Sequence, residues 1–101
     1  MTEKRRPIIE YSQQSLINAK EIVAYLQSKF SEKEVNNFLK TLEEFEKIIS
    51  IYPTLYSESR KRKIRKAVLS KVLSIFYTVK KNKISIVAIL DNRWEKTGEL
   101  G

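Results

Sequence analysis

The 101-residue sequence contains no cysteine and no histidine. These two absences exclude thiol nucleophiles, disulfide bonds, Cys/His zinc sites and an imidazole general base. Only two glycines and two prolines are present, which argues against a loop-rich or fibrous chain. The sequence also lacks metal-ligand spacing and a glycine-rich phosphate loop, so it predicts no metal and no cofactor.

Long hydrophobic runs are missing as well. No apolar stretch approaches the roughly 18 residues needed to cross a membrane, and no signal-type apolar core follows the basic start of the chain. Hydrophobic residues nevertheless make up 42% of the sequence, which is enough for a packed core. We therefore expect one soluble, cytoplasmic domain over residues 1–101, with flexible tails at 1–6 and 95–101.

The positive charge is concentrated in the second part of the chain. Residues 1–59 hold 8 Lys/Arg and 9 Asp/Glu, whereas residues 60–101 hold 12 Lys/Arg and 3 Asp/Glu. The two parts therefore carry formal net charges of −1 and +9 within a total of +8. This asymmetry favours an acidic partner, either nucleic acid or an acidic protein segment, although a merely solubilising face would look the same.

Two helices are predicted in the first part. Ser12 is a suitable N-cap for a helix over 13–29, whose apolar residues at helical spacing are Leu16, Ala19, Ile22, Val23, Leu26 and Phe30. The sequence Ser31-Glu32-Lys33-Glu34 matches a capping box and starts a second helix, which Pro53 ends. The apolar stripe of that helix comprises Val35, Phe38, Leu39, Leu42, Phe45, Ile48, Ile49 and Tyr52. The two helices should form an antiparallel hairpin, and we favour packing within the chain over a coiled-coil dimer.

Strands are predicted at both ends of the sequence. Residues 7–11 read as a short strand, and 60–91 read as a three-strand antiparallel meander rich in Val, Ile, Phe and Tyr. The meander opens with the basic run Arg60–Lys66, which is typical of the charged end of an edge strand. Its second and third strands, at 72–79 and 84–90, are more apolar and should be central, with Asn82 at a positive-φ turn position. The predicted fold class is α+β, with the helices packed on the sheet.

Few residues could carry chemistry. Asp91 ends an apolar strand and should act as a strand-end cap or as a partner of Arg93. Metal-free RNA cleavage needs cations near the phosphate and a group that moves protons, and Lys71, Tyr77 and Arg93 are candidates by position. Core packing is the competing interpretation for Tyr77. Trp94 could stack on a base or a partner side chain, or cover the end of the core.

Several segments, taken in order, resemble the RelE/ParE superfamily of type II toxin–antitoxin toxins, which includes the plasmid-stabilisation proteins. They are Tyr11-Ser12, Ile51-Tyr52-Pro53-Thr54-Leu55-Tyr56, Arg65-Lys66-Ala67-Val68-Leu69, Ser74-Ile75-Phe76-Tyr77-Thr78-Val79 and Ile86-Val87-Ala88-Ile89-Leu90-Asp91-Asn92-Arg93. The resemblance covers the chain from about Ile9 to Arg93. It implies a bacterial toxin that causes growth arrest and is neutralised by a cognate antitoxin, whose acidic C-terminal segment lies along the sheet.

The resemblance also indicates a branch. RelE-like mRNA interferases place an Arg at the entry of the second meander strand and a Tyr after the Arg that follows the last strand. Here Arg65 and Arg93 could fill two catalytic places, but Ser74 stands at that entry and no Tyr or His follows Arg93. The long paired helices are also more similar to the ParE branch, whose toxins inhibit DNA gyrase by binding.

Three functions remain open from the sequence. The first is a ParE-like gyrase inhibitor without catalysis, which we expect. The second is a ribosome-dependent endoribonuclease using Arg65, Lys71, Tyr77 and Arg93, and the third is a non-toxic regulator of its antitoxin. The residues expected to bind the antitoxin or nucleic acid are Arg60, Lys61, Arg62, Lys63, Arg65, Lys66, Arg93 and Trp94.

Overall fold

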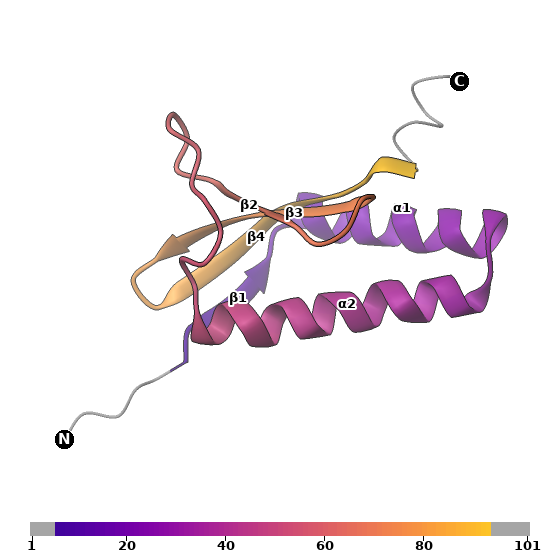
Figure 1. Ribbon diagram of the computed structural model, residues 1–101, viewed down its shortest axis with the longest axis horizontal. Helices are drawn as coiled ribbons and strands as arrows, with labels where there is room; N and C mark the ends of the chain where they lie inside the picture. The colour runs from indigo at the N-terminus through magenta and orange to yellow at the C-terminus, as the bar shows by residue number, and fades with distance from the viewer. Residues whose placement is uncertain (1–5, 94–101) are drawn as a thin grey trace.

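The computed structural model describes residues 6–93 and shows an α+β fold of two helices and four strands (Figure 1). The elements in chain order are β1 (Ile8–Tyr11), α1 (Gln13–Lys29), α2 (Glu32–Ile51), β2 (Arg65–Val68), β3 (Leu73–Lys80) and β4 (Lys83–Asp91). The predicted fold class is confirmed. The expected tails lie, apart from Arg6, outside the described residues. In the described part, neither helix is both long and apolar enough to span a membrane.

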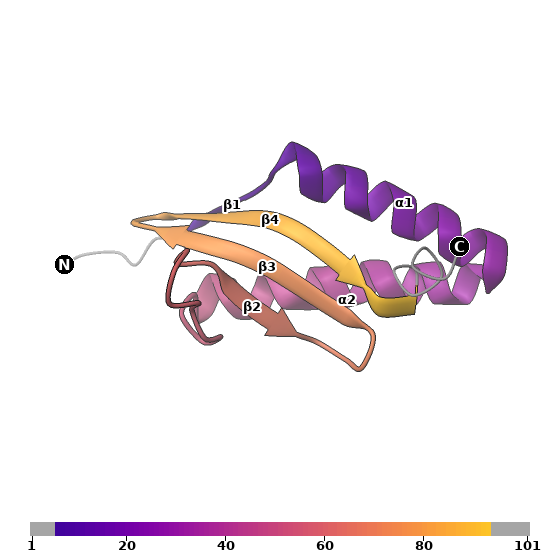
Figure 2. The same ribbon diagram turned by 90° about the horizontal axis from the view of Figure 1, so that it is seen from above.

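The four strands form one sheet in the order β1-β4-β3-β2 (Figure 2). The three strands of the meander are antiparallel, whereas β1 pairs in parallel with β4. β3 and β4 are therefore central, as predicted from their apolar sequences, and β2 is an edge strand. Because β1 pairs with β4, the first and last strands of the described residues are neighbours in the sheet.

The two helices cover different parts of the sheet (Figures 1 and 2). α2 passes beneath one face, while α1 runs alongside β4 beyond the end of β1. Where β1 stops, polar groups near α1 bond to the exposed edge of β4. The Ser12 N–H donates to the Ile86 carbonyl at 2.9 Å, and the Asn18 Oδ1 accepts from the Ile89 N–H at 3.1 Å. The open edge of a central strand is thereby paired.

A single core lies between the sheet and the helices. Its members are Ile22, Leu26, Val35, Phe38, Leu42, Phe45, Ile49, Ala67, Leu73, Ile75, Tyr77, Ile84, Ile86 and Ile89. The predicted helix stripes were too wide, because five of their residues are substantially exposed: Leu16, Phe30, Leu39, Ile48 and Tyr52. Each helix is covered only on the sides that face the sheet and the other helix, so the borders of its stripe reach solvent.

The predicted strand start at Arg60 is wrong. Residues 60–62 form a turn, residues 63 and 64 are irregular, and strand pairing of β2 with β3 begins at Arg65. The turn is closed by the Ser59 N–H, which donates to the Ile64 carbonyl at 2.8 Å, and Lys63 adopts a φ of 56°. A run of four adjacent cations has few apolar side chains to anchor it to the sheet, so the chain leaves the sheet there.

The predicted capping box is only half correct. Ser31 is the N-cap residue of α2, but within residues 6–93 its side chain makes no capping hydrogen bond. The Glu34 carboxylate does not reach back to Ser31 and bonds instead to the Arg93 guanidinium at 3.4 Å. A charged guanidinium is a stronger hydrogen-bond partner for the Glu34 carboxylate than the neutral backbone N–H of Ser31. By contrast, Ser12 caps α1 as predicted, because its Oγ accepts from the Ser15 N–H at 3.0 Å.

The turn between β3 and β4 also differs from expectation. The positive-φ residue is Lys81, with a φ of 46°, rather than Asn82. The Asn82 carbonyl accepts the Ile8 N–H at 2.9 Å, which joins this turn to the start of β1. The carbonyl of Asn82 thus takes part in the pairing of β1 with the sheet, and Lys81 is the turn residue that adopts the left-handed conformation.

Candidate functional site

The segment of residues 57–64, here called the basic loop, carries four consecutive exposed cations, Arg60 to Lys63. It rises from the sheet on the side away from α2 (Figure 1). Ser59 organises its turn, since the Oγ accepts from the Arg62 N–H at 3.2 Å and the Ile64 N–H at 3.4 Å. The loop thus holds a dense positive charge in a defined backbone conformation.

An apolar groove of about 380 Å³ lies beside the basic loop. Ile64 and Phe76 supply its hydrophobic lining, and the side chains of Arg62 and Lys66 border it. The Lys66 ammonium lies 5.7 Å from the centre of the Phe76 ring, a cation–π distance. Cations around an apolar groove suit an acidic segment that also carries hydrophobic side chains.

Arg65 is directed differently from its neighbour Lys66. Successive side chains of a strand point to opposite faces, and Arg65 is half-buried whereas Lys66 is exposed. The Arg65 guanidinium donates to the Tyr56 carbonyl at 2.7 Å. It therefore holds the segment that leads from α2 to the basic loop. Of the predicted basic run, only Arg65 and Lys66 lie on the sheet, and they point to opposite faces.

Tyr77 is in the core, as the packing interpretation predicts. Its side chain is 0% exposed and packs against the rings of Phe45 and Tyr56, at centroid distances of 5.6 and 6.4 Å. The hydroxyl donates to the Pro53 carbonyl at 2.9 Å. Burial raises the pKa of Tyr77 above its ordinary value, so the neutral phenol is favoured. A buried, hydrogen-bonded phenol is poorly placed to exchange protons with a bound substrate.

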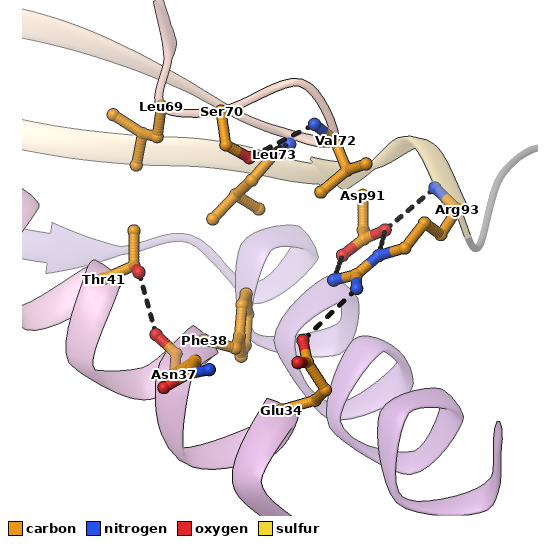
Figure 3. A pocket seen from close by; sticks show the side chains of 10 residues that line it. All are labelled: Glu34, Asn37, Phe38, Thr41, Leu69, Ser70, Val72, Leu73, Asp91 and Arg93. Atoms are coloured by element: carbon orange, nitrogen blue, oxygen red, sulfur yellow. Dashed lines mark hydrogen bonds and ion pairs between the residues drawn. The ribbon is translucent and has the colours of Figure 1, made fainter. Parts of the chain in front are cut away.

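Arg93 is paired with Asp91, as predicted, and its guanidinium also reaches α2 (Figure 3). Its Nη2 lies 2.9 Å from one Asp91 oxygen, and its Nε donates to the other at 3.2 Å. Its Nη1 contacts Glu34 at 3.4 Å, and its Cζ lies 5.1 Å from the centre of the Phe30 ring. The pKa of Arg93 is raised, chiefly by the hydrogen bonds to Asp91. These contacts hold the guanidinium on the helix side of the sheet.

The four candidate catalytic residues form two separate pairs. Arg65 stands opposite Tyr77 in the β2–β3 register. Lys71 is exposed in the turn that precedes Leu73, and Arg93 follows Asp91, the register partner of Leu73. Tyr77 and Leu73 are four residues apart on β3, so the backbone positions of the two pairs are separated by about 13 Å along the sheet. Trp94, the remaining expected site residue, lies outside the described residues.

Some contacts were not foreseen from the sequence. The Tyr11 hydroxyl donates to the Glu46 carboxylate and joins β1 to α2. Burial and the Glu46 carboxylate both raise the pKa of Tyr11. Alternation along β3 would have placed Phe76 on the face opposite Tyr77, but nothing local indicates that it would meet Ile64. Among residues 6–93, no group of three or more acidic side chains is placed to hold a metal ion.

Solved structures match this fold closely, although the sequence is distant from all of them. No family model matches the sequence, and the search of curated proteins also gave no match. A chain of the chromosomal ParDE TA system from P. aeruginosa matches with a TM-score of 0.70 and 13% identity, over 85% of this chain and 96% of that one. The YoeB dimer from Staphylococcus aureus matches with a TM-score of 0.60 and 22% identity, over 85% of this chain and 97% of that one. A chain of the E. coli DinJ-YafQ complex matches with a TM-score of 0.56 and 15% identity, over 88% of this chain and 97% of that one.

These matches confirm the fold that the sequence resemblance implied. The chain has the fold of the RelE/ParE superfamily toxins. The coverage is nearly complete in both directions, so the match concerns the whole domain rather than a shared supersecondary motif. At 11–22% identity the likeness concerns the fold, and the activity must be argued from this chain's own residues.

Proposed function

We propose that this protein is the toxin of a type II toxin–antitoxin system, that it acts in the ParE manner by binding DNA gyrase, and that an antitoxin neutralises it. The fold supports the toxin assignment, since a ParDE system, YoeB and YafQ share it. The DinJ-YafQ structure is a toxin–antitoxin complex, so a toxin of this fold can be held by a partner chain.

The observation that carries the ParE-like assignment is the arrangement of the candidate catalytic residues. Tyr77 is fully buried with its hydroxyl on Pro53, and the Arg93 guanidinium is engaged by Asp91 and Glu34. Metal-free phosphate cleavage requires cations and a proton-transfer group gathered around one phosphorus atom. The backbone of Tyr77 lies about 13 Å along β3 from Leu73, next to which Lys71 and Arg93 stand, and its hydroxyl is buried. Tyr77 is therefore not placed to transfer protons at a phosphate held by those two cations. A toxin that works by binding alone needs no such constellation.

The basic residues have a separate role in this proposal. Arg62 and Lys66 line the apolar groove, and Arg60, Lys61 and Lys63 are exposed in the basic loop beside it. Together these cations provide the attraction for an acidic antitoxin segment. Arg65 and Arg93 face the helix side, where Arg65 bonds to the Tyr56 carbonyl and Arg93 joins the end of β4 to α2. In this proposal the antitoxin binds the exposed residues among those predicted from the sequence, which are Arg60 to Lys63 and Lys66.

The deciding experiment measures gyrase supercoiling with the purified protein. We expect inhibition at micromolar concentration together with trapped gyrase–DNA cleavage complexes, and Tyr77→Phe should inhibit equally because only a buried hydroxyl is removed. Supercoiling that continues unchanged at micromolar protein would refute the proposal.

The same variant separates the endoribonuclease alternative. If the protein cleaved mRNA on translating ribosomes, expression would give codon-linked cuts, and loss of the proton-transferring phenol would reduce cleavage by about 100-fold or more. We expect mRNA to remain intact during growth arrest by both the wild type and Tyr77→Phe. Harmless overexpression of a folded protein would instead favour the regulator of the antitoxin.

A further inference from the structure

The turn that joins α1 to α2 lies beyond the end of the sheet (Figures 1 and 2). Residues 27–33 are all exposed, and the nearest buried side chains are Leu26 and Val35, which belong to the core. We call residues 27–34 the hairpin tip. A segment with so little buried surface is expected to open locally at a low free-energy cost unless another contact restrains it.

Arg93 supplies such a contact. Its guanidinium bonds to Asp91 at the end of β4 and reaches across to Glu34 in the hairpin tip (Figure 3). It also lies against the ring of Phe30, in the same tip. We propose that Arg93 is a positioning residue, and that it forms a latch with a fixed arm to Asp91 and a releasable arm to Glu34 and Phe30. Closing the latch sets the position of the hairpin tip relative to the sheet. This inference does not depend on the proposed toxin function.

The two arms differ in strength because they differ in burial. The Asp91 side chain is 1% exposed, receives two guanidinium bonds and also accepts the Arg93 backbone N–H at 2.9 Å. Removing the cation from a buried carboxylate is strongly unfavourable. The Glu34 side chain is 36% exposed and makes one contact of 3.4 Å, so water and salt weaken that pair. The latch should therefore open at Glu34 and leave Arg93 on Asp91.

Opening at Glu34 also changes a groove between α2 and the sheet. Glu34, Asp91 and Arg93 line one part of this groove of about 200 Å³, and Phe38 and Leu73 line an apolar part. When Glu34 leaves, the guanidinium N–H group that bonded to it can donate to another carboxylate in the groove. An acidic group of a partner that takes this position would favour the open latch by mass action.

Hydrogen–deuterium exchange of the full-length protein tests the latch. In Glu34→Ala we expect amides of the hairpin tip to exchange at least about fivefold faster, while those of β3 and β4 stay unchanged. Glu32→Ala is the matched control, because Glu32 and Glu34 both lie in the first turn of α2 and interact alike with its dipole. In the control we expect less than about a twofold change.

Salt provides a second and independent readout. Raising sodium chloride from about 0.05 to 0.5 M should accelerate tip exchange in the wild type and leave Glu34→Ala unaffected, because only the wild type has an exposed arm to screen. Arg93→Lys should behave as Glu34→Ala does, since an ammonium cannot reproduce the forked geometry. Equal tip exchange in Glu34→Ala and Glu32→Ala, or equal salt dependence of wild type and Glu34→Ala, would overturn the latch.

Discussion

Tyr77 and Tyr52 show how far the surroundings decide the chemistry of a residue. Tyr52 is 62% exposed at the end of α2, whereas Tyr77 is 0% exposed and donates its hydroxyl hydrogen bond inside the core. The same side chain is therefore a surface phenol at one position and a packing residue at the other. Arg93 is a comparable case, because a cation expected to meet a partner is held by Asp91 and Glu34.

Alkaline stability tests the assignment of Tyr77. A raised folded-state pKa contributes stability below the unfolded value of about 10, and this contribution is lost as the pH rises through the folded value. Tyr77→Phe should cost about 1 kcal/mol at pH 8 through the lost bond to Pro53, and should lose less stability than the wild type above pH ~10. Denaturant unfolding at several pH values measures both effects.

Tyr52→Phe is the control for this comparison. Since Tyr52 is largely exposed, its replacement should leave the unfolding free energy within about 0.5 kcal/mol of the wild type. If Tyr77→Phe were as stable as Tyr52→Phe at pH 8, the hydrogen bond to Pro53 would contribute nothing to folding.

At the scale of an element, α2 shows what an amphipathic pattern does and does not specify. Its sequence places eight apolar residues from Val35 to Tyr52 in one broad stripe. The structure buries five of the residues within the helix, which are Val35, Phe38, Leu42, Phe45 and Ile49. Leu39 and Ile48 lie at the borders of the stripe and are 49% and 41% exposed. Position around the helix axis, rather than hydrophobicity, separates the two groups.

Ile48 and Ile49 provide a matched pair for this distinction. They are adjacent and identical in chemistry, but Ile49 is 0% exposed and Ile48 is 41% exposed. Ile49→Ala should destabilise the protein by about 2–5 kcal/mol through lost burial and a residual cavity. Ile48→Ala should cost less than about 1 kcal/mol, because its side chain is already partly hydrated. Equilibrium unfolding in urea gives both values, and similar losses would contradict the observed orientation of α2.

At the scale of the whole molecule, the charge is separated in space as well as in sequence. The part up to residue 59, which includes both helices, is close to neutral, whereas the meander and its loop carry the excess of cations. The fold presents the basic loop on the side of the sheet away from α2 (Figure 1). A polyanion should therefore be attracted to one side of the protein more strongly than the net charge alone implies.

Two variants of equal net charge test this asymmetry. Replacing Arg60, Lys61, Arg62 and Lys63 by Gln lowers the formal charge from +8 to +4, and so does replacing the exposed helix residues Lys20, Lys29, Lys33 and Lys40. The loop variant should elute from immobilised heparin at clearly lower salt than the helix variant, with a shallower dependence of log K on log salt. Equal elution would mean that net charge, not its location, governs anion binding.

The sequence by itself determined the local elements and their order. The Ser12 cap, the helix from Gln13 to Lys29 and the two central apolar strands follow from short-range patterns that a few neighbouring residues specify. The order of these elements, with the motifs on them, also implied the RelE/ParE-type fold. The errors at Arg60 and Asn82 lay at an element boundary and within a tight turn.

The tertiary structure alone decided which long-range partners the polar residues find. Glu34 has a locally ideal capping position beside Ser31, yet it bonds to Arg93, 59 residues away. Phe76 and Ile64 line the same groove, and Tyr77 bonds to Pro53, although no periodic pattern couples these positions. Local propensities involve energies of a kcal/mol or so, and burial or a charged partner of similar magnitude can override them. The basic residues were therefore visible in the sequence, but only the fold separated the exposed ones from those that hold the structure together.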